Sequence, residues 1–114
     1  MKSEKFKIIK LVKEFIMRVE ENLVNFPKKD LELKREIKEI TYGILLKVYS
    51  ANITSDKTKR KALQEQIIAE IKYLDFLINL CYEKKIINAK KYLRFGEKLD
   101  ELVRNIMGWM KATS

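Results

Sequence analysis

Three carboxylates near the end of the chain are the first residues whose spacing could serve chemistry. Asp100 and Glu101 follow Glu97 by three and four residues, a spacing that places both near Glu97 on one face of a helix. Neighbouring carboxylates can act as general acids and bases or hold a metal ion. A di-iron helix motif, however, pairs a glutamate with a histidine three residues later, and the chain has no histidine. We interpret these acids as a solvated helix face.

The other reactive groups give no catalytic pattern. Cys81 is the only cysteine, so an intramolecular disulfide is excluded, and its thiol is predicted to pack in the core. The sequence has no Gly-rich phosphate loop and no Ser/His/Asp or Cys/His set. We therefore expect a protein that is not an enzyme and that holds no cofactor or metal.

Positive charge is the stronger signal, because 25 Lys and Arg residues against 16 Asp and Glu residues give a net charge of +9. Two cation clusters lie where helices are expected to begin: Lys57, Lys59, Arg60 and Lys61, and then Lys90, Lys91 and Arg94. A helix N-terminus attracts anions, so both clusters are predicted phosphate sites for a nucleic acid. The alternative is an ordinary solvated lysine-rich surface, in which the cations pair with nearby glutamates.

Four amphipathic helices are predicted to position these residues. The longest apolar-periodic run, 61–82, forms a central helix, preceded by helices over 3–25 and 30–51. A fourth helix begins after residue 88 and reaches nearly to the last residue. Short links between four helices predict one all-α domain over 1–114, an up-down-up-down antiparallel four-helix bundle.

The predicted helix boundaries rest on caps and on one proline. Pro27 cannot continue a helix interior and ends the first helix. Asp30, then Ser55 or Asp56, and then Asn88 are predicted to cap the three later helices, because their side-chain oxygens can accept from free backbone amides.

Apolar residues repeat along each helix at steps of three and four, as buried faces do. The first helix carries Phe6, Ile9, Val12, Ile16, Val19, Leu23 and Phe26, and the last carries Tyr92, Phe95, Leu99, Leu102, Ile106 and Trp109. The central helix has one set (Leu63, Ile67, Ile71, Leu74, Ile78 and Cys81) and a second on an adjoining face (Ala69, Tyr73, Phe76 and Leu80). We expect Trp109 to be buried, either in the bundle or at an interface.

The second helix predicts self-association. Leu33, Ile37, Ile40, Ile44, Val48 and Ala51 form one stripe, and Tyr42, Leu46, Tyr49 and Ile53 form another on nearly the opposite side. In a four-helix monomer only one of them can face the core, so the other is left as an exposed patch of the kind that marks an interface. The alternative is that the tyrosines rest half covered on the surface with their hydroxyls in water.

No run of apolar residues predicts a membrane span, because lysines and aspartates such as Lys47, Lys72 and Asp75 interrupt each candidate. The start of the chain scatters lysines through its apolar residues and lacks a signal-peptide pattern. A cytoplasmic protein without membrane contact is the expectation.

Several stretches resemble one small four-helix-bundle family. They are Phe26-Pro27, the helix start Leu33-Lys34-Arg35, the run IKYLDFLINLCY, and the ending IMGWMK with Gly108-Trp109-Met110-Lys111. Together they are similar to the family of the accessory variability determinant (Avd) of diversity-generating retroelements, which also includes ribosomal-RNA intervening-sequence proteins. The ending favours the retroelement branch. Met107, Asp75 and Asn79 depart from that branch's usual Gly and Arg residues.

The resemblance implies a basic homo-oligomer, typically a pentamer, that binds a reverse transcriptase together with RNA or DNA. The predicted nucleic-acid-binding residues also include Lys34 and Arg35, and the predicted interface includes Trp109. Two alternatives stay open: a bundle of the intervening-sequence type, and a purely structural helical adaptor whose positive surface meets an acidic protein.

Overall fold

A computed structural model describes residues 2–114, with side chains from residue 7 onward. The described chain is all-helical and contains no strand. Its elements are α1 (Lys2–Leu23), the short 3₁₀ helix η1 (Lys28–Asp30), α2 (Leu31–Ile53), α3 (Lys57–Glu83) and α4 (Ala89–Thr113).

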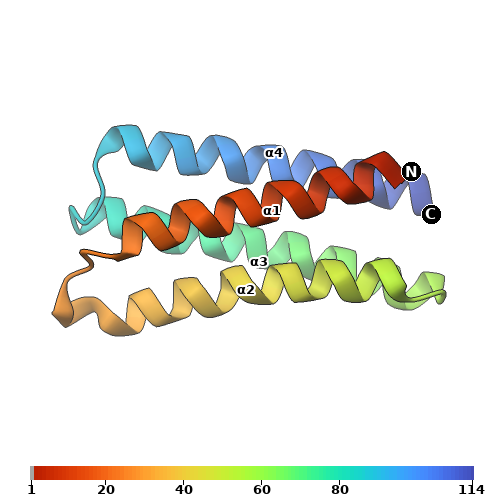
Figure 1. Cartoon of the computed structure of the whole chain (residues 1–114), viewed down its shortest axis with the longest axis horizontal. Coiled ribbons are helices and arrows are strands. Elements are labelled where there is room, and N and C mark those ends of the chain that lie inside the picture. Colours follow the sequence, from red (N-terminus) through yellow and green to blue (C-terminus); the bar gives the residue numbers. More distant parts are fainter. Residues whose placement is uncertain (1) are drawn as a thin grey trace.

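The four long helices lie side by side in a ring. α1 packs against α2 and α4, and α3 packs against the same two helices. The molecule measures 43 × 23 × 19 Å. In Figure 1 both chain ends lie at one end of the molecule with the α2–α3 link, and the other two links lie at the opposite end. None of the described helices is both long and apolar enough to cross a membrane.

Two of the predicted helix caps are confirmed, and the third, Asp30, takes the N-cap position without the predicted cap bond. The Asp56 carboxylate accepts from the Thr58 and Lys59 amides, and the Asn88 side chain accepts from the Lys91 amide. Asp30 precedes α2 but makes no side-chain cap bond. It closes the 3₁₀ turn after Pro27, so its backbone is not in the extended conformation of an N-cap.

The Asp30 side chain instead joins the two links at that end of the bundle. One carboxylate oxygen lies 3.1 Å from the Lys84 ammonium, and the side chain is only 8% exposed. Its other oxygen is buried and has no hydrogen-bond partner among the described residues. This ion pair ties the start of α2 to the end of α3.

The end of α3 closes in a Schellman motif. The Ile86 amide donates to the Cys81 carbonyl at 2.8 Å, and the Lys85 amide donates to the Tyr82 carbonyl at 2.9 Å. Lys85 takes the left-handed position of this motif with φ 63°, where glycine is the usual residue. The turn redirects the chain into α4.

The predicted core stripes of α3 and α4 are confirmed except for Leu63 and Tyr92, which are only partly buried, and the register of α1 was partly wrong. Ile67, Ile71, Leu74, Ile78 and Cys81 of α3 and Phe95, Leu99, Leu102, Ile106 and Trp109 of α4 are all buried. On α1 the buried set is Ile8, Leu11, Val12, Phe15, Val19 and Leu23, whereas Ile9 and Ile16 are only partly buried. Phe6 lies outside the described side chains.

Phe15 explains the register of α1. Its ring meets the Phe95 ring of α4 edge to face, with centroids 5.5 Å apart. In two adjacent apolar pairs of α1, Ile8–Ile9 and Phe15–Ile16, only the first residue is buried, whereas Leu11 and Val12 are both buried. The neighbours Ile9 and Ile16 then lie at the edge of that core.

Candidate functional site

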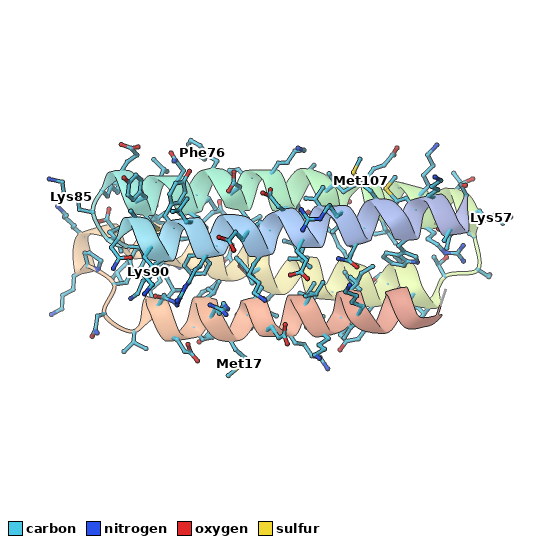
Figure 2. The ribbon with its side chains drawn as sticks, turned by 90° about the horizontal axis from the view of Figure 1, so that it is seen from above. Met17, Lys57, Phe76, Lys85, Lys90 and Met107 are labelled. Atoms are coloured by element: carbon cyan, nitrogen blue, oxygen red, sulfur yellow. The ribbon has the colours of Figure 1, made fainter. Side chains whose placement is uncertain are left out.

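The predicted cation cluster at the start of α3 is mostly free surface. Lys57, Lys59 and Lys61 are exposed, and Figure 2 places Lys57 at the opposite end of the bundle from Lys85 and Lys90. Arg60 differs, because its guanidinium donates to the Thr54 carbonyl at 2.8 Å and is partly buried. Arg60 therefore helps to close the α2–α3 link.

Helix capping limits the predicted anion sites at the N-termini of α3 and α4. In each case a cap oxygen, from Asp56 or Asn88, already accepts backbone N–H groups that a phosphate would otherwise take. The attraction for anions at these ends consequently comes from the lysine and arginine side chains, which remain on the surface.

The cations at the start of α4 take part in a feature that spans two helices. Lys91 and Arg94 line a cavity of about 280 Å³ together with Arg18, Glu21 and Asn22 of α1, and the Phe95 ring forms part of its wall. We call this cavity the α1–α4 cleft. Lys90, the neighbouring cation, is exposed beside it.

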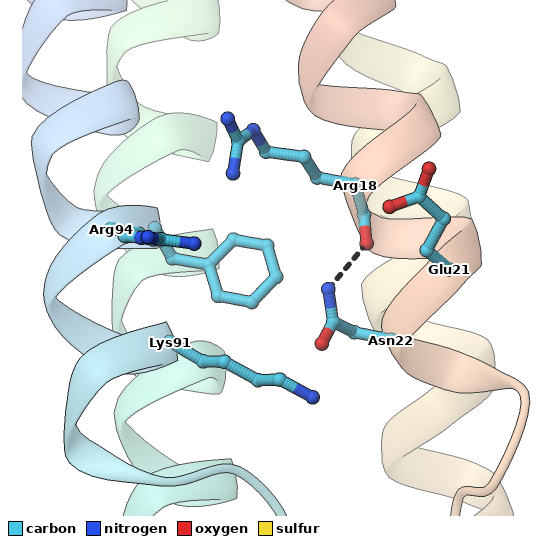
Figure 3. Close-up of a pocket in the computed structure, with 6 residues that line it drawn as sticks. Arg18, Glu21, Asn22, Lys91 and Arg94 are labelled. Carbon is cyan, nitrogen blue, oxygen red and sulfur yellow. Dashed lines mark hydrogen bonds between the residues drawn. The ribbon is translucent and has the colours of Figure 1, made fainter.

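Three positive charges converge in the α1–α4 cleft. Figure 3 shows the side chains of Arg18, Arg94 and Lys91 pointing into the space between α1 and α4, while the Glu21 carboxylate lies over the α1 ribbon. Among the described side chains, no carboxylate lies within 4.0 Å of any of the three cations. The Asn22 amide nitrogen donates to the Arg18 carbonyl at 2.8 Å, which fixes Asn22 in the wall.

Arg18 was not among the predicted site residues. It lies 73 positions before Lys91 in the sequence, and nothing in the local pattern of α1 indicates which helix its polar side will meet. Its only sequence signal is its place on that polar side, near Glu21 and Asn22. The packing of α1 on α4 brings it into the cleft.

Beyond the α1–α4 cleft, a groove continues along α4, and its lining carries both positive and negative charges. A shallower hollow shares Arg18 and Arg94 with the cleft and continues along α4, where Glu97, Asp100 and Glu101 alternate with Lys98 and Arg104. Lys98 lies 4.0 Å from Glu101. The three acids predicted to be a solvated face thus lie along an open groove of mixed charge. Within the described residues, no group of three or more acidic, cysteine or histidine residues is arranged to hold a metal ion.

Lys34 and Arg35 lie in a third place, near the start of α2. Arg35 is exposed and Lys34 partly so. Lys34 is close enough to Glu20 of α1 to contribute to the lowered pKa of that carboxyl, after the larger effects of a hydrogen bond from Tyr42 and of nearby Lys38. The predicted nucleic-acid-binding residues are therefore divided among three surfaces, and two of them, Lys91 and Arg94, share the α1–α4 cleft.

The outer stripe of α2 is exposed in the single chain, as the sequence predicted. The exposed fractions are 45% for Tyr42, 67% for Leu46, 39% for Tyr49 and 86% for Ile53. The Tyr42 hydroxyl donates to the Glu20 carboxylate of α1, an interaction that raises the pKa of Tyr42. The stripe therefore lies toward the α1–α2 side of the molecule.

A second exposed apolar stripe runs along α3. Ala69, Tyr73 and Phe76 are exposed, and Leu80 is partly buried. The Tyr73 hydroxyl donates to the Glu36 carboxylate of α2 at 3.2 Å, so this stripe begins on the α2–α3 side. Figure 2 shows Phe76 pointing away from α3 and Met17 pointing away from α1 on the other side of the molecule.

Trp109 does not belong with these exposed residues. It is 1% exposed within the single chain, so its indole fills the bundle core and presents no surface to a second copy. Its assignment to the interface is corrected on that ground, while its predicted burial is confirmed. The burial of Cys81 is also confirmed, and loss of contact with water raises the pKa of its thiol to about 11.

Comparison of the chain with known protein families, with curated proteins and with solved structures finds no match.

Proposed function

We propose that this chain is a non-enzymatic, basic, homo-oligomeric protein that binds RNA or DNA through phosphate contacts. The observation that carries the proposal is the convergence of Arg18, Lys91 and Arg94, with no carboxylate of the described side chains within 4.0 Å of them. Like charges repel, and a phosphate placed among them would stabilise the arrangement. The exposed lysines at the start of α3 would provide further phosphate contacts.

A stacked aromatic pair near the cleft supports single-stranded nucleic acid as the ligand. The Tyr82 and Tyr92 rings stack with centroids 4.8 Å apart, and Tyr82 is partly exposed. Tyr82 lines a hollow that shares Lys91 with the α1–α4 cleft. Unpaired bases stack on such rings without sequence preference.

The two exposed stripes support assembly from identical copies. They lie on different sides of an up-down-up-down antiparallel bundle, so one stripe of a chain would meet a different surface of the next chain. Such a heterologous contact closes into a ring when the rotation between neighbours permits. The number of copies, five, comes only from the resemblance to the Avd family.

The resemblance also supplies the biological setting of the proposal. An Avd-like protein would act beside a reverse transcriptase in a diversity-generating retroelement. A gene for a reverse transcriptase and paired template and variable repeats next to this gene would support that setting; their absence would leave an intervening-sequence-type bundle or an adaptor.

A salt titration tests nucleic-acid binding. The affinity for a single-stranded oligonucleotide should fall with salt, with a log–log slope of roughly −0.7 for each phosphate contacted. Changing Lys90, Lys91 and Arg94 to Gln, or Lys57, Lys59 and Lys61 to Gln, should flatten that slope by up to about 2.

A matched control removes three cations that already have carboxylate partners. Lys38, Lys47 and Lys98 lie 3.6, 2.9 and 4.0 Å from Glu20, Glu70 and Glu101, so changing them to Gln alters the net charge equally but should alter the slope less. Equal flattening by all three triple variants would mean that only net charge matters. Absence of binding at about 50 mM salt, where phosphate contacts are strong, would favour the adaptor that meets an acidic protein.

Assembly is tested by light scattering on a size-exclusion column. The wild type should have a mass that is a multiple of its 13.6 kDa chain. The double variant Leu46→Glu, Ile53→Glu should dissociate, because it would place charges in the contact. Met107→Glu, at a position of α4 that is 57% exposed, is the matched control and should leave the mass unchanged. A monomeric wild type would exclude the assembly.

A further inference from the structure

We propose that the α1–α4 cleft binds the terminal phosphate monoester of a nucleic-acid strand, with Arg18, Lys91 and Arg94 as its ligands. This inference rests on the proposed nucleic-acid binding and specifies which part of the strand this cavity takes.

The charge of the lining favours a dianion. Three cations face a single lining carboxylate, Glu21, which gives the cleft a net charge of +2. A phosphodiester within a strand carries one negative charge, whereas a terminal phosphate carries between one and two at neutral pH, because its second pKa is about 6. Two guanidinium groups and one ammonium group match the several oxygens of such a phosphate.

The size of the cleft favours a small group. Its volume of about 280 Å³ lies just below the usual range of pockets for drug-sized molecules, roughly 300–1,000 Å³. A phosphate with part of its sugar needs less room than a drug-sized ligand. The cleft is also a cavity between two helices, with Phe95 in its wall, and is not a flat surface.

The surroundings of the cleft favour the end of a strand over its interior. In one direction the groove along α4 adds three acids, Glu97, Asp100 and Glu101, and two cations, Lys98 and Arg104, so beyond the two shared arginines its lining has a net charge of −1 and attracts further phosphates less than the cleft does. In the other direction Lys91 is shared with the hollow at the α3–α4 link, where Lys85 and Tyr82 lie. The rest of the strand is therefore better accommodated on the Lys91 side than along α4, as expected for a phosphate at the end of a strand.

The test compares strands that differ only at their ends. An internally labelled single-stranded oligonucleotide with two hydroxyl ends is bound to the full chain and competed with unlabelled copies carrying a 5′-phosphate, a 3′-phosphate or no end phosphate. We expect one of the phosphorylated copies to compete about ten- to a hundredfold better than the hydroxyl-ended copy, since the dianion gains charge-assisted hydrogen bonds. The advantage should shrink at pH 5, where the end phosphate loses its second charge.

Variants assign the effect to the cleft. Arg18→Gln should remove the advantage of the phosphorylated end, because the end phosphate then loses one of its three cations, and it should weaken binding of the hydroxyl-ended strand by a smaller factor. Lys91→Gln provides a second variant should the first fail to fold, as judged by circular dichroism. Arg104→Gln is the matched control, since Arg104 lines the neighbouring groove of mixed charge and lies outside the cleft lining; it should retain the advantage.

The outcomes separate this inference from the function on which it rests. Equal competition by all strands, or an advantage that survives both Arg18→Gln and Lys91→Gln, would overturn the terminal-phosphate site while nucleic-acid binding stands. Failure of every strand to bind would overturn both. Competition by free inorganic phosphate at the same concentration as the phosphorylated strand would show that the cleft is a general anion site and would also overturn the assignment to a strand end.

Discussion

Replacing Trp109 is the most direct test of how the core is built. Its side chain is 1% exposed, and burial of a tryptophan removes roughly 150–250 Å² from water. At about 25 cal/mol per Å², this burial contributes roughly 4–6 kcal/mol. The alanine side chain keeps only a small part of the apolar contact of the indole, and the rest of the site becomes a cavity. Trp109→Ala should therefore lower the free energy of unfolding by about 3–5 kcal/mol. For a chain of this length the Tm should fall by about 12–20 °C.

Trp109→Phe should cost far less, for a reason specific to this site. The indole Nε1–H is buried and has no hydrogen-bond partner among the described residues. An unpaired buried donor costs about 1–3 kcal/mol, which Phe removes. The smaller ring leaves a cavity that costs roughly as much. We therefore expect Trp109→Phe to lie within about 1 kcal/mol of the wild type, since these two contributions nearly cancel.

Urea unfolding followed by far-ultraviolet circular dichroism measures both variants. Trp109 is the only tryptophan, so its fluorescence cannot serve the comparison. All chains must be compared at one concentration, because assembly adds to apparent stability. Met107→Ala, on the exposed side of α4, is the control and should change stability by no more than about 0.5 kcal/mol. If Trp109→Phe were as damaging as Trp109→Ala, the indole N–H would have a buried partner and the reasoning would be refuted.

Three further predictions concern the α3–α4 end of the molecule. Lys85→Gly should raise the free energy of unfolding by about 0.5–1 kcal/mol, because Lys85 has φ 63° and glycine adopts that conformation without steric strain. A variant with the same free energy of unfolding as the wild type would contradict this. Lys84→Met should destabilise the chain more than Asp30→Asn does in urea unfolding, because it leaves the buried Asp30 carboxylate unpaired, whereas the half-exposed Lys84 ammonium can turn to water. Alkylation of Cys81 by iodoacetamide at pH 8 should be much slower in the native chain than in the urea-unfolded chain, because the native pKa of its thiol is raised to about 11. Equal rates in the two states would show an accessible thiol. The same shift contributes stability that is present below the unfolded pKa of about 8.5 and is lost as the pH rises toward 11.

Local signals in the sequence predicted the parts of the fold that depend on local chemistry. Asn88, and Asp56 as one of two candidates with Ser55, were predicted as caps because the bonds they form reach only two or three residues along the chain. Asp30 has the same residue type and a similar place before a helix, but its partner Lys84 is 54 positions away. Asp30 therefore follows the turn after Pro27 and pairs with a residue far away in the sequence, although its residue type favours capping the helix that it precedes.

The same distinction applies to the candidate site. Periodicity identified the exposed stripe of α2, because an apolar face opposite the core face is visible in the helix alone. Arg18 could not be found in that way, since its significance depends on the proximity of α1 to α4. Periodicity also could not choose between Phe15 and Ile16 for the centre of the core, because adjacent residues both lie within a wide apolar arc.

The proposed assembly and the proposed anion site use different sides of the bundle. The Tyr42 bond to Glu20 places the α2 stripe toward α1, and the Tyr73 bond to Glu36 places the α3 stripe toward α2. The cleft lies between α1 and α4. Copies joined through the stripes would thus leave each cleft open, and one assembly would present several phosphate sites at once. Strands long enough to reach two clefts would then bind more tightly than short ones through effective concentration, without any new contact.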